Sequence, residues 1–401
     1  MTDLFWPGDH RAGDLMSDAA FLAAMVDVEN AWLGVIVDAE VAPSAARADI
    51  AAMVSAADAE SLAVAAEADG NPVIGLVALL RDRSAGQTAR WLHRGLTSQD
   101  VIDTALMLCL REAISRIRGD LTTQVRTLVG LAETHHRSPM LARTLTQPAL
   151  PSTVGAKIAN WLSGVLDAVD TLAAVPALPV QVGGAAGTLA ATTELAGSPV
   201  EALALSDSLA TALGLTAAAP WHTTRSVITR AGDALVGCCD AWGHVAADVA
   251  MGGRREIGEL AEGRGGGSST MPHKSNPVLS VLIRRAALTA PALAATLHTA
   301  SAASVDERSD GGWHAEWATL RTLTRRAVVA ASQTSELLTG LQVDVERAAA
   351  NLAAAGDVRA EQRAMAELTE RQAHSEYFGA SEQLVDAVLQ RARLHLKEAT
   401  S

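Results

Sequence analysis

The stretch 223–262 contains no proline, and its apolar residues recur at helical spacing. This pattern predicts one helix of about 40 residues, about 60 Å long at a rise of 1.5 Å per residue. A helix of that length needs partners along its apolar stripe. Helices predicted at 278–303 and 313–341 can pack beside it as a bundle. The sequence therefore indicates a fold organised around long helices.

The remaining sequence also favours helices. Hydrophobic residues make up 49% of the chain but aromatic residues only 3%, so the core must close by packing many small side chains such as alanine and leucine. Capping groups at 97–100 precede a predicted helix at 101–118, and another helix is expected after Pro151 and Ser152. We predict an all-α protein with boundaries near residues 98 and 342, which gives segments 1–98, 99–342 and 343–401.

The charge of the chain argues against some classes of binding partner, and its cysteine content indicates the cellular compartment. The formal net charge of −13 argues against general binding to nucleic acid or to an anionic membrane surface. Three cysteines, two of them adjacent, make a disulfide framework improbable and favour a cytoplasmic protein. The first residues do not form a basic segment followed by an apolar one, which a secretory leader would show. No apolar run without charges is long enough to span a bilayer. No metal-ligand spacing or dinucleotide fingerprint stands out, so we predict neither a metal nor a cofactor.

The run GRGGGSSTMPHKSNP at 263–277 carries the clearest chemical signal. Glycines let the backbone turn several N–H groups toward one point, while Ser268, Ser269, Lys274 and Asn276 add donors and a positive charge. These groups suit an anionic substrate whose charge grows during reaction. The order of residues differs from that of a phosphate-binding P-loop. Taken by itself, such a glycine and proline cluster can also be a plain connection between helices.

The full run 268–277 resembles a signature of the fumarase/aspartase superfamily. Segment 91–100 resembles the first signature region of that family, and 143–148 together with 151–155 resembles the second. The resemblance covers essentially the whole chain. It implies a three-domain fold with a central long-helix bundle, and a homotetramer whose subunits together form a twenty-helix core. It also implies active sites that three subunits share, and a C-terminal domain at 343–401 that is shorter than in relatives.

Three further segments, 183–188, 221–225 and 311–317, are most similar to the muconate cycloisomerase branch of the superfamily. This similarity implies a small polycarboxylate substrate. The implied reaction is reversible intramolecular lactonisation of 3-carboxy-cis,cis-muconate to 4-carboxymuconolactone, a step of protocatechuate (β-ketoadipate) degradation. Trp313 and Trp317 are either substrate contacts or two aromatic residues on one buried helical face.

The resemblance also assigns roles to individual residues. Ser268 matches the serine that exchanges a proton with substrate carbon, and Lys274 would stabilise the carbanion-like intermediate. Arg225 could hold a carboxylate or be an ordinary surface arginine, and His93 could contact substrate or lie at the edge of the core. The expected substrate-binding residues are His93, Thr97, Ser98, Thr144, Gln147, Arg225, Ser269 and Asn276.

The chain departs from many relatives at two positions. Relatives that expel an amine carry a histidine where this chain has Leu145 and a glutamate where it has Val281. Losing both members of such a pair would leave an apolar patch at little cost, whereas losing one would strand a buried polar group. A carboxylate leaves as a stable anion without an acid, which fits lactone chemistry.

Other functions stay open. A lyase with another stable anionic leaving group, of the nitrosuccinate type, satisfies the same leaving-group argument. A lyase like adenylosuccinate or argininosuccinate lyase should need the histidine that Leu145 replaces. A non-catalytic tetrameric scaffold is a further alternative, although Ser268, Lys274 and Asn276 are all present.

Overall fold

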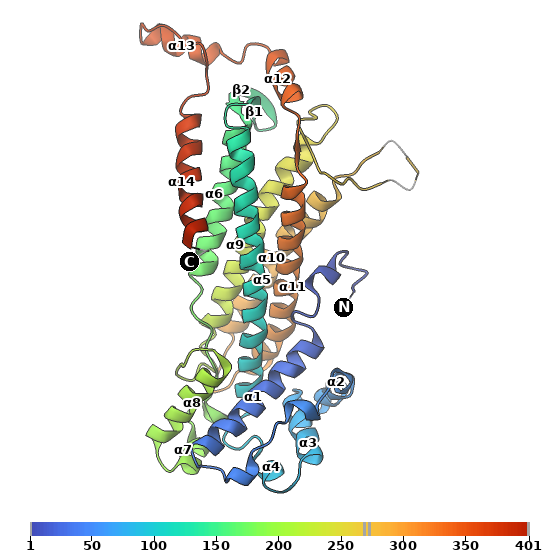
Figure 1. The fold of residues 1–401 in the computed structure, drawn as a ribbon, viewed down its shortest axis with the longest axis vertical. Coiled ribbons are helices and arrows are strands. Elements are labelled where there is room, and N and C mark those ends of the chain that lie inside the picture. Colours follow the sequence, from blue (N-terminus) through green and yellow to red (C-terminus); the bar gives the residue numbers. More distant parts are fainter. Residues whose placement is uncertain (1, 268–269, 272–273, 399–401) are drawn as a thin grey trace. The chain divides into compact units, whose positions relative to one another are not determined.

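The computed structural model describes residues 2–267, 270–271 and 274–398, and most of them are helical (Figure 1). The prediction of an all-α protein is confirmed. The helices are α1 (Asp18–Asp38), α2 (Ala59–Asp69), α3 (Val73–Arg83), α4 (Gly86–Trp91), α5 (Ser98–Thr134), α6 (Val154–Ala173), α7 (Ala190–Ala196), α8 (Pro199–Leu213), α9 (Ser226–Gly252), α10 (Val278–Ala302), α11 (Gly311–Thr339), α12 (Val345–Ala354), α13 (Ala360–Leu368) and α14 (Ser381–Glu398). The strands are β1 (Pro139–Thr144), β2 (Gln147–Thr153), β3 (Leu260–Ala261) and β4 (Gln342–Val343).

Two of the long helices, α5 and α9, differ in length from the sequence prediction, whereas α10 agrees with it. Helix α10 begins and ends within one residue of its predicted bounds, whereas α5 is 37 residues long and continues well beyond residue 118. Helix α9 has 27 residues instead of about 40. It ends at Gly252 because the chain turns there and Leu260 packs back, leaving no room for a Cβ on that glycine. The helix therefore ends at a glycine, earlier than predicted, although no proline follows to stop it.

Contacts within the chain divide it into two units. The first unit comprises Met1–Arg116, Val175–Asp233 and Ala292–Arg326, and the second comprises Ile117–Ala174, Ala234–Pro291 and Ala327–Ser401. Each unit is therefore built from three separate stretches of sequence. Helices α5, α9, α10 and α11 each contribute residues to both units. The predicted boundaries near residues 98 and 342 follow the sequence pattern and stay a prediction.

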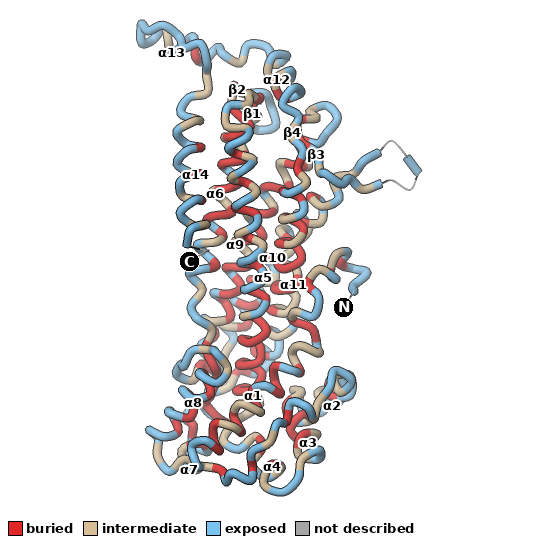
Figure 2. Tube along the Cα trace, in the orientation of Figure 1, coloured by how far each residue is buried: buried red, intermediate tan, exposed pale blue. Residues whose placement is uncertain are grey.

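The first unit has α1 as its central apolar helix. Ser17 caps α1 by accepting a hydrogen bond from the N–H of Ala20 at 3.1 Å. Trp32, Leu33 and Ile36 on α1 are fully buried, and α1 packs against α8. Helices α2 and α3 pack on each other, as do α7 and α8. Figure 2 shows the resulting concentration of buried positions along α1.

The second unit contains the four strands found in the described part of the chain. Strands β1 and β2 form an antiparallel hairpin, α12 contacts β1, and α14 packs on α6. Thr153 caps α6 by accepting from the N–H of Ala156 at 3.1 Å, as expected for a helix that follows Pro151 and Ser152. Inside the unit, Trp242 Nε1 donates to Gln124 Oε1 at 2.8 Å, which pairs a buried indole with a buried amide. The hairpin itself was not predicted.

Among the described residues, two helices are long and apolar enough to cross a membrane by length and composition alone, although both contain charged residues. In α1, 61% of the apolar window is buried inside the chain, as is usual for a core helix. In α10 only 28% of the window is buried. Helix α10 therefore presents apolar residues that the chain itself does not cover.

Candidate functional site

Asp100 organises the first signature region, in the first unit. Its buried carboxylate accepts hydrogen bonds from the N–H groups of Gly183 at 2.9 Å, Gly184 at 3.0 Å and Thr97 at 2.9 Å. Its Oδ1 also lies 3.0 Å from His222 Nε2. One carboxylate thus joins three stretches of sequence at the start of α5. Gly183 is required here because a Cβ on it would lie 2.5 Å from the His222 ring.

Thr97 and Ser98 lie at the N-terminus of α5 and are only partly buried. Arg308 Nη1 donates to Thr97 Oγ1 at 3.1 Å, and the Arg308 guanidinium also stands over the Trp313 ring. A helix N-terminus with an adjacent guanidinium favours anions because both present positive charge and N–H donors. The position of both residues is therefore compatible with the predicted contact to a substrate carboxylate.

The structure corrects the prediction for Arg225. Its guanidinium is fully buried and forms ion pairs with Asp103 at 2.7 Å and Glu316 at 2.6 Å. Further hydrogen bonds to the same carboxylates occupy Nε and both Nη atoms, and the guanidinium stacks on Trp221. Arg225 is neither a surface arginine nor available to a substrate carboxylate, and it neutralises two buried acids. Burial raises the pKa of Glu316, while Arg225 beside it acts in the opposite direction.

Trp313 belongs to the same buried cluster. Its Nε1 donates to Asp103 Oδ1 at 3.0 Å, and its ring meets Trp317 edge-on with centroids 4.6 Å apart. This arrangement matches the interpretation of two aromatic residues packed on one helical face.

His93 follows α4 and contacts the first helix of the chain. Its Nδ1 lies 2.5 Å from Oε1 of Glu29 on α1, and the Glu29 side chain is 1% exposed. The histidine itself is partly exposed, at the edge of the core. Contact with substrate stays a prediction for His93.

Thr144 and Gln147 lie on the β1–β2 hairpin, in the second unit. They face each other as the last pair of the ladder, and both are exposed. The two residues of the turn, Leu145 and Thr146, have positive φ angles of 48° and 69°. Such a two-residue turn normally takes asparagine or glycine, so Leu145 holds an unfavourable backbone conformation at the tip.

The glycine loop is closed at its base. Gly266 and Asn276 exchange two backbone hydrogen bonds of 2.8 Å, and Asn276 Nδ2 donates to the carbonyl of Gly267 at 3.1 Å. Glu262 accepts from the N–H groups of Leu279 at 3.1 Å and Ser280 at 2.7 Å, which caps α10. Glu262 supplies this cap because Pro277, just before the helix, has no side-chain acceptor.

The predicted residues of the loop differ in what the structure shows of them. Lys274 is exposed, with its backbone N–H bonded to Met271 O at 3.0 Å. Asn276 uses its amide to brace the loop. Ser268 and Ser269 lie outside the described residues.

Leu145 and Val281 do not form the expected buried apolar patch within the chain. Leu145 is 96% exposed at the hairpin tip, and Val281 on α10 is 55% exposed. The chemical consequence is unchanged, since neither side chain can donate a proton.

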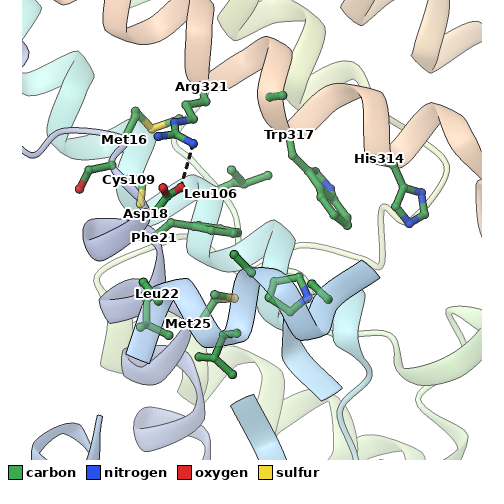
Figure 3. Close-up of a pocket in the computed structure, with 17 residues that line it drawn as sticks. Met16, Asp18, Phe21, Leu22, Met25, Leu106, Cys109, His314, Trp317 and Arg321 are labelled. Carbon is green, nitrogen blue, oxygen red and sulfur yellow. Dashed lines mark hydrogen bonds and ion pairs between the residues drawn. The ribbon is translucent and has the colours of Figure 1, made fainter. Parts of the chain in front are cut away.

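An apolar pocket of about 340 Å³ lies within the first unit, between α1, α2 and α11 (Figure 3). Phe21, Met25 and Trp317 line it, and the ion pair of Asp18 with Arg321, at 2.8 Å, stands at its side. Trp317 was considered as a substrate contact, whereas none of the expected catalytic and substrate-binding residues in the described chain lines this pocket.

Sequence reasoning missed the acids that hold the predicted site residues or their neighbours in place, namely Glu29, Asp103 and Glu316 in the first unit and Glu262 in the second. The available signal was a charged residue inside an apolar helical face, as at Asp103 between Ile102 and Ala105. Among the described residues, no group of three or more His, Cys, Asp or Glu side chains is arranged to hold a metal ion.

Known proteins resemble this chain over most of its length. A family model described as Lyase matches residues 23–291. A nitrosuccinate lyase from Streptomyces davaonensis is 44% identical over 88% of this chain and 77% of its own length. A 3-carboxy-cis,cis-muconate cycloisomerase from Bradyrhizobium diazoefficiens is 39% identical over 82% and 73%.

Solved structures agree. A 3-carboxy-cis,cis-muconate lactonizing enzyme from Pseudomonas putida has a TM-score of 0.80 at 32% identity, covering 96% of this chain and 86% of that one. A fumarate lyase from a Mesorhizobium species has a TM-score of 0.80 at 26% identity, covering 94% and 97%. The chain belongs to the fumarase/aspartase superfamily of lyases.

Proposed function

We propose that this protein is a lyase that expels a stable anion from a small polycarboxylate, and that elimination of nitrite from nitrosuccinate is its reaction. The sequence alone placed the muconate cycloisomerase first and a nitrosuccinate-type lyase second. We place nitrosuccinate first because the Streptomyces relative matches at higher identity and over more of the chain than the Bradyrhizobium cycloisomerase.

The observation that carries the proposal is the pair of aliphatic side chains at Leu145 and Val281. Relatives that expel an amine place an imidazole and a carboxylate at these positions, because an amine must be protonated to leave. Leu145 and Val281 cannot supply that proton. Nitrite and carboxylates are weak bases at neutral pH and leave without one. The two positions therefore favour substrates with anionic leaving groups.

The reaction balances without a cofactor. Ser268, ionised as its alkoxide, accepts a proton from the carbon next to one substrate carboxylate and becomes a hydroxyl, while charge gathers on that carboxylate as an enediolate. The electron pair then forms a carbon–carbon double bond while nitrite departs with the pair of the broken carbon–nitrogen bond. Nitrosuccinate thus yields fumarate, nitrite and a proton. Lys274 stabilises the enediolate charge, and preorganised charge of this kind is usually the largest catalytic contribution.

Substrate carboxylates need further partners. Thr97 and Ser98 offer hydroxyls and a helix N-terminus beside Arg308, and Thr144 and Gln147 present exposed polar side chains at the hairpin. Arg225 is left out of this set because its donors are occupied. Asn276 acts through the loop that it braces.

We also propose a homotetramer with shared active sites. Helix α10 is apolar, yet only 28% of its apolar window is buried, and Leu288 on it is 77% exposed. Packing α10 of one subunit against α10 of others would bury this surface. Sedimentation of the purified protein tests the assembly, and a monomer at micromolar concentration would contradict it.

Lactonisation of 3-carboxy-cis,cis-muconate is the second candidate. It is favoured by the solved lactonizing enzyme from Pseudomonas putida, which covers 96% of this chain at a TM-score of 0.80. In the lactone-opening direction the leaving group is a carboxylate, so the same residues serve.

Two assays separate the candidates. Purified protein is given nitrosuccinate, with nitrite and fumarate measured together, and in parallel 3-carboxy-cis,cis-muconate, with loss of diene absorbance. We expect equal amounts of nitrite and fumarate, and a kcat/KM for nitrosuccinate at least about 100-fold above that for the muconate. A preference for the muconate assigns the second candidate. If the protein turns over neither compound, the proposed function is contradicted.

A further inference from the structure

Glu29 is a carboxylate in the apolar core of the first unit. Its neighbours along α1, Val28 and Trp32, are essentially inaccessible, and the Glu29 side chain itself is 1% exposed. The structure shows one hydrogen-bonding partner for the Glu29 carboxylate in the described chain, Nδ1 of His93 at 2.5 Å. A buried carboxylate is costly unless it is paired. The contact with His93 is therefore the arrangement that makes Glu29 tolerable in the core.

The backbone at His93 is clamped from both sides. His93 has a φ of 60°, a left-handed conformation that is uncommon for a residue other than glycine. Arg81 Nη2 donates to the carbonyl of Leu92 at 2.8 Å, and Trp32 Nε1 donates to the carbonyl of Arg94 at 2.8 Å. A strained conformation persists only where its surroundings hold it, and such places are often functional. The surroundings here fix both the backbone and the ring of His93.

The Nε2 edge of the His93 ring remains available to a ligand. With Nδ1 directed at Glu29, the structure shows no hydrogen bond to Nε2 from any described residue, and the His93 side chain is 17% exposed. Thr97 and Ser98 follow four and five residues later at the start of α5. The charged groups around the pair are Arg81 on α3, which interacts electrostatically with Glu29, and Arg94, which follows His93.

We propose that Glu29 is a positioning residue for His93, holding Nδ1–H so that Nε2 faces a substrate carboxylate. Glu29 and His93 then form an imidazole–carboxylate pair in the first signature region, while the pair of the amine-expelling relatives is missing at Leu145 and Val281. The pair binds substrate and takes no part in expelling the leaving group. This inference rests on the proposed function, because it needs a polycarboxylate substrate.

Orientation by a carboxylate is a general device for histidine. The group that bonds one ring nitrogen determines the tautomer and the direction of the other nitrogen. Glu29 lies on α1, a helix with a rigid buried core, so it holds the ring more precisely than a loop residue would. Replacing Glu29 should weaken binding and leave the chemical step largely intact.

A double-mutant cycle tests the inference. Glu29→Gln keeps the shape and removes the charge, and Asn is chosen for His93→Asn because it tolerates a positive φ. We expect each single variant to raise KM for nitrosuccinate about tenfold, with kcat within about threefold of the parent. In the His93→Asn background, Glu29→Gln should change KM by less than about twofold, since its effect passes through the histidine.

A merely structural role gives a different result. Additive effects of the two substitutions on KM, or an unchanged KM in Glu29→Gln, would overturn the proposal. Should Glu29→Gln not fold, Glu29→Leu replaces the buried charge with an apolar side chain suited to the core, and the same cycle applies. Asp233→Asn is the matched control, because it breaks another histidine–carboxylate pair, the exposed one of His298 with Asp233 at 3.0 Å, and should leave KM unchanged.

Failure of the proposed function is distinguishable from failure of the inference. A parent protein that releases nitrite while the cycle is additive refutes the inference alone. A parent that turns over neither substrate refutes the proposed function, and the cycle is then measured on succinate binding by calorimetry. Coupling in that assay supports the pair as a carboxylate-binding unit, and additivity overturns it.

Discussion

The polar residues around the first signature region and those of the glycine loop differ in burial. Around Asp100 and Arg225, carboxylates, guanidinium and backbone N–H groups are buried and fully engaged with one another. In the loop and the β1–β2 hairpin, Lys274, Thr144 and Gln147 are exposed and make few side-chain contacts. Both regions match signatures of the same superfamily.

This difference shows that a signature contains two kinds of residue. Buried members such as Asp100 build the scaffold and tolerate change poorly, because any substitution strands a partner. Exposed members such as Lys274 cost the fold nothing and are available to substrate. Substitutions of the buried members should therefore reduce stability, and those of the exposed members should reduce activity.

The largest effect is expected at Ser268. Ser268→Ala removes the proposed proton acceptor, so kcat for nitrite release should fall by about 10³-fold, while the thermal unfolding midpoint stays unchanged. Steady-state kinetics and calorimetry measure the two quantities. Ser275→Ala in the same loop is the control and should keep kcat within about twofold of the parent. Equal losses in both variants would remove Ser268 from its special role.

The next largest effect belongs to the buried region. Arg225→Met leaves Asp103 and Glu316 buried without their counter-charge, and should cost about 3 kcal/mol of unfolding free energy. Urea denaturation measures the loss. Arg393→Met breaks the exposed pair with Glu133 and should cost under about 1 kcal/mol. If Arg225→Met proved as mild as that control, the triad would not be structural.

Two glycine-to-alanine substitutions, one at a crowded and one at an open position, test the structural role of the buried region. Gly183→Ala places a Cβ 2.5 Å from the His222 ring and 3.0 Å from Pro220, and should destabilise the protein by about 1–3 kcal/mol. Gly130→Ala within α5 meets no atom within 4 Å, and should stabilise by about 0.5–1 kcal/mol. The two changes in melting temperature should have opposite signs. An unchanged or raised melting temperature in Gly183→Ala would show that the contact at His222 relaxes freely.

The smallest effect is expected at the stem of the loop. Glu262→Ala removes the cap of α10 and should cost about 1 kcal/mol, with a further severalfold loss of kcat because Lys274 is less well placed. Ser198→Ala removes the cap of α8 and should lower stability similarly without affecting kcat. Equal kcat values in the two variants would restrict Glu262 to a capping role.

Local pattern predicted much of the fold. Helical spacing identified α10 nearly to the residue, because one amphipathic helix with clear ends is specified by its own sequence. It overestimated α9, because the stop at Gly252 depends on Leu260 returning to pack against it. It missed the β1–β2 hairpin, whose second strand contains Pro148 and Pro151, residues that disfavour a strand unless the partner strand accommodates them.

The sequence by itself determined the superfamily, the all-α class and the absence of a proton donor at Leu145 and Val281, because these depend on residue types and their spacing. Tertiary structure decided which polar residues are free to act. Arg225 looked suited to a substrate and is committed to Asp103 and Glu316, whereas His93 is held by Glu29, 64 residues earlier in the chain. Such partners come together only on folding, and burial makes each of them indispensable to the other.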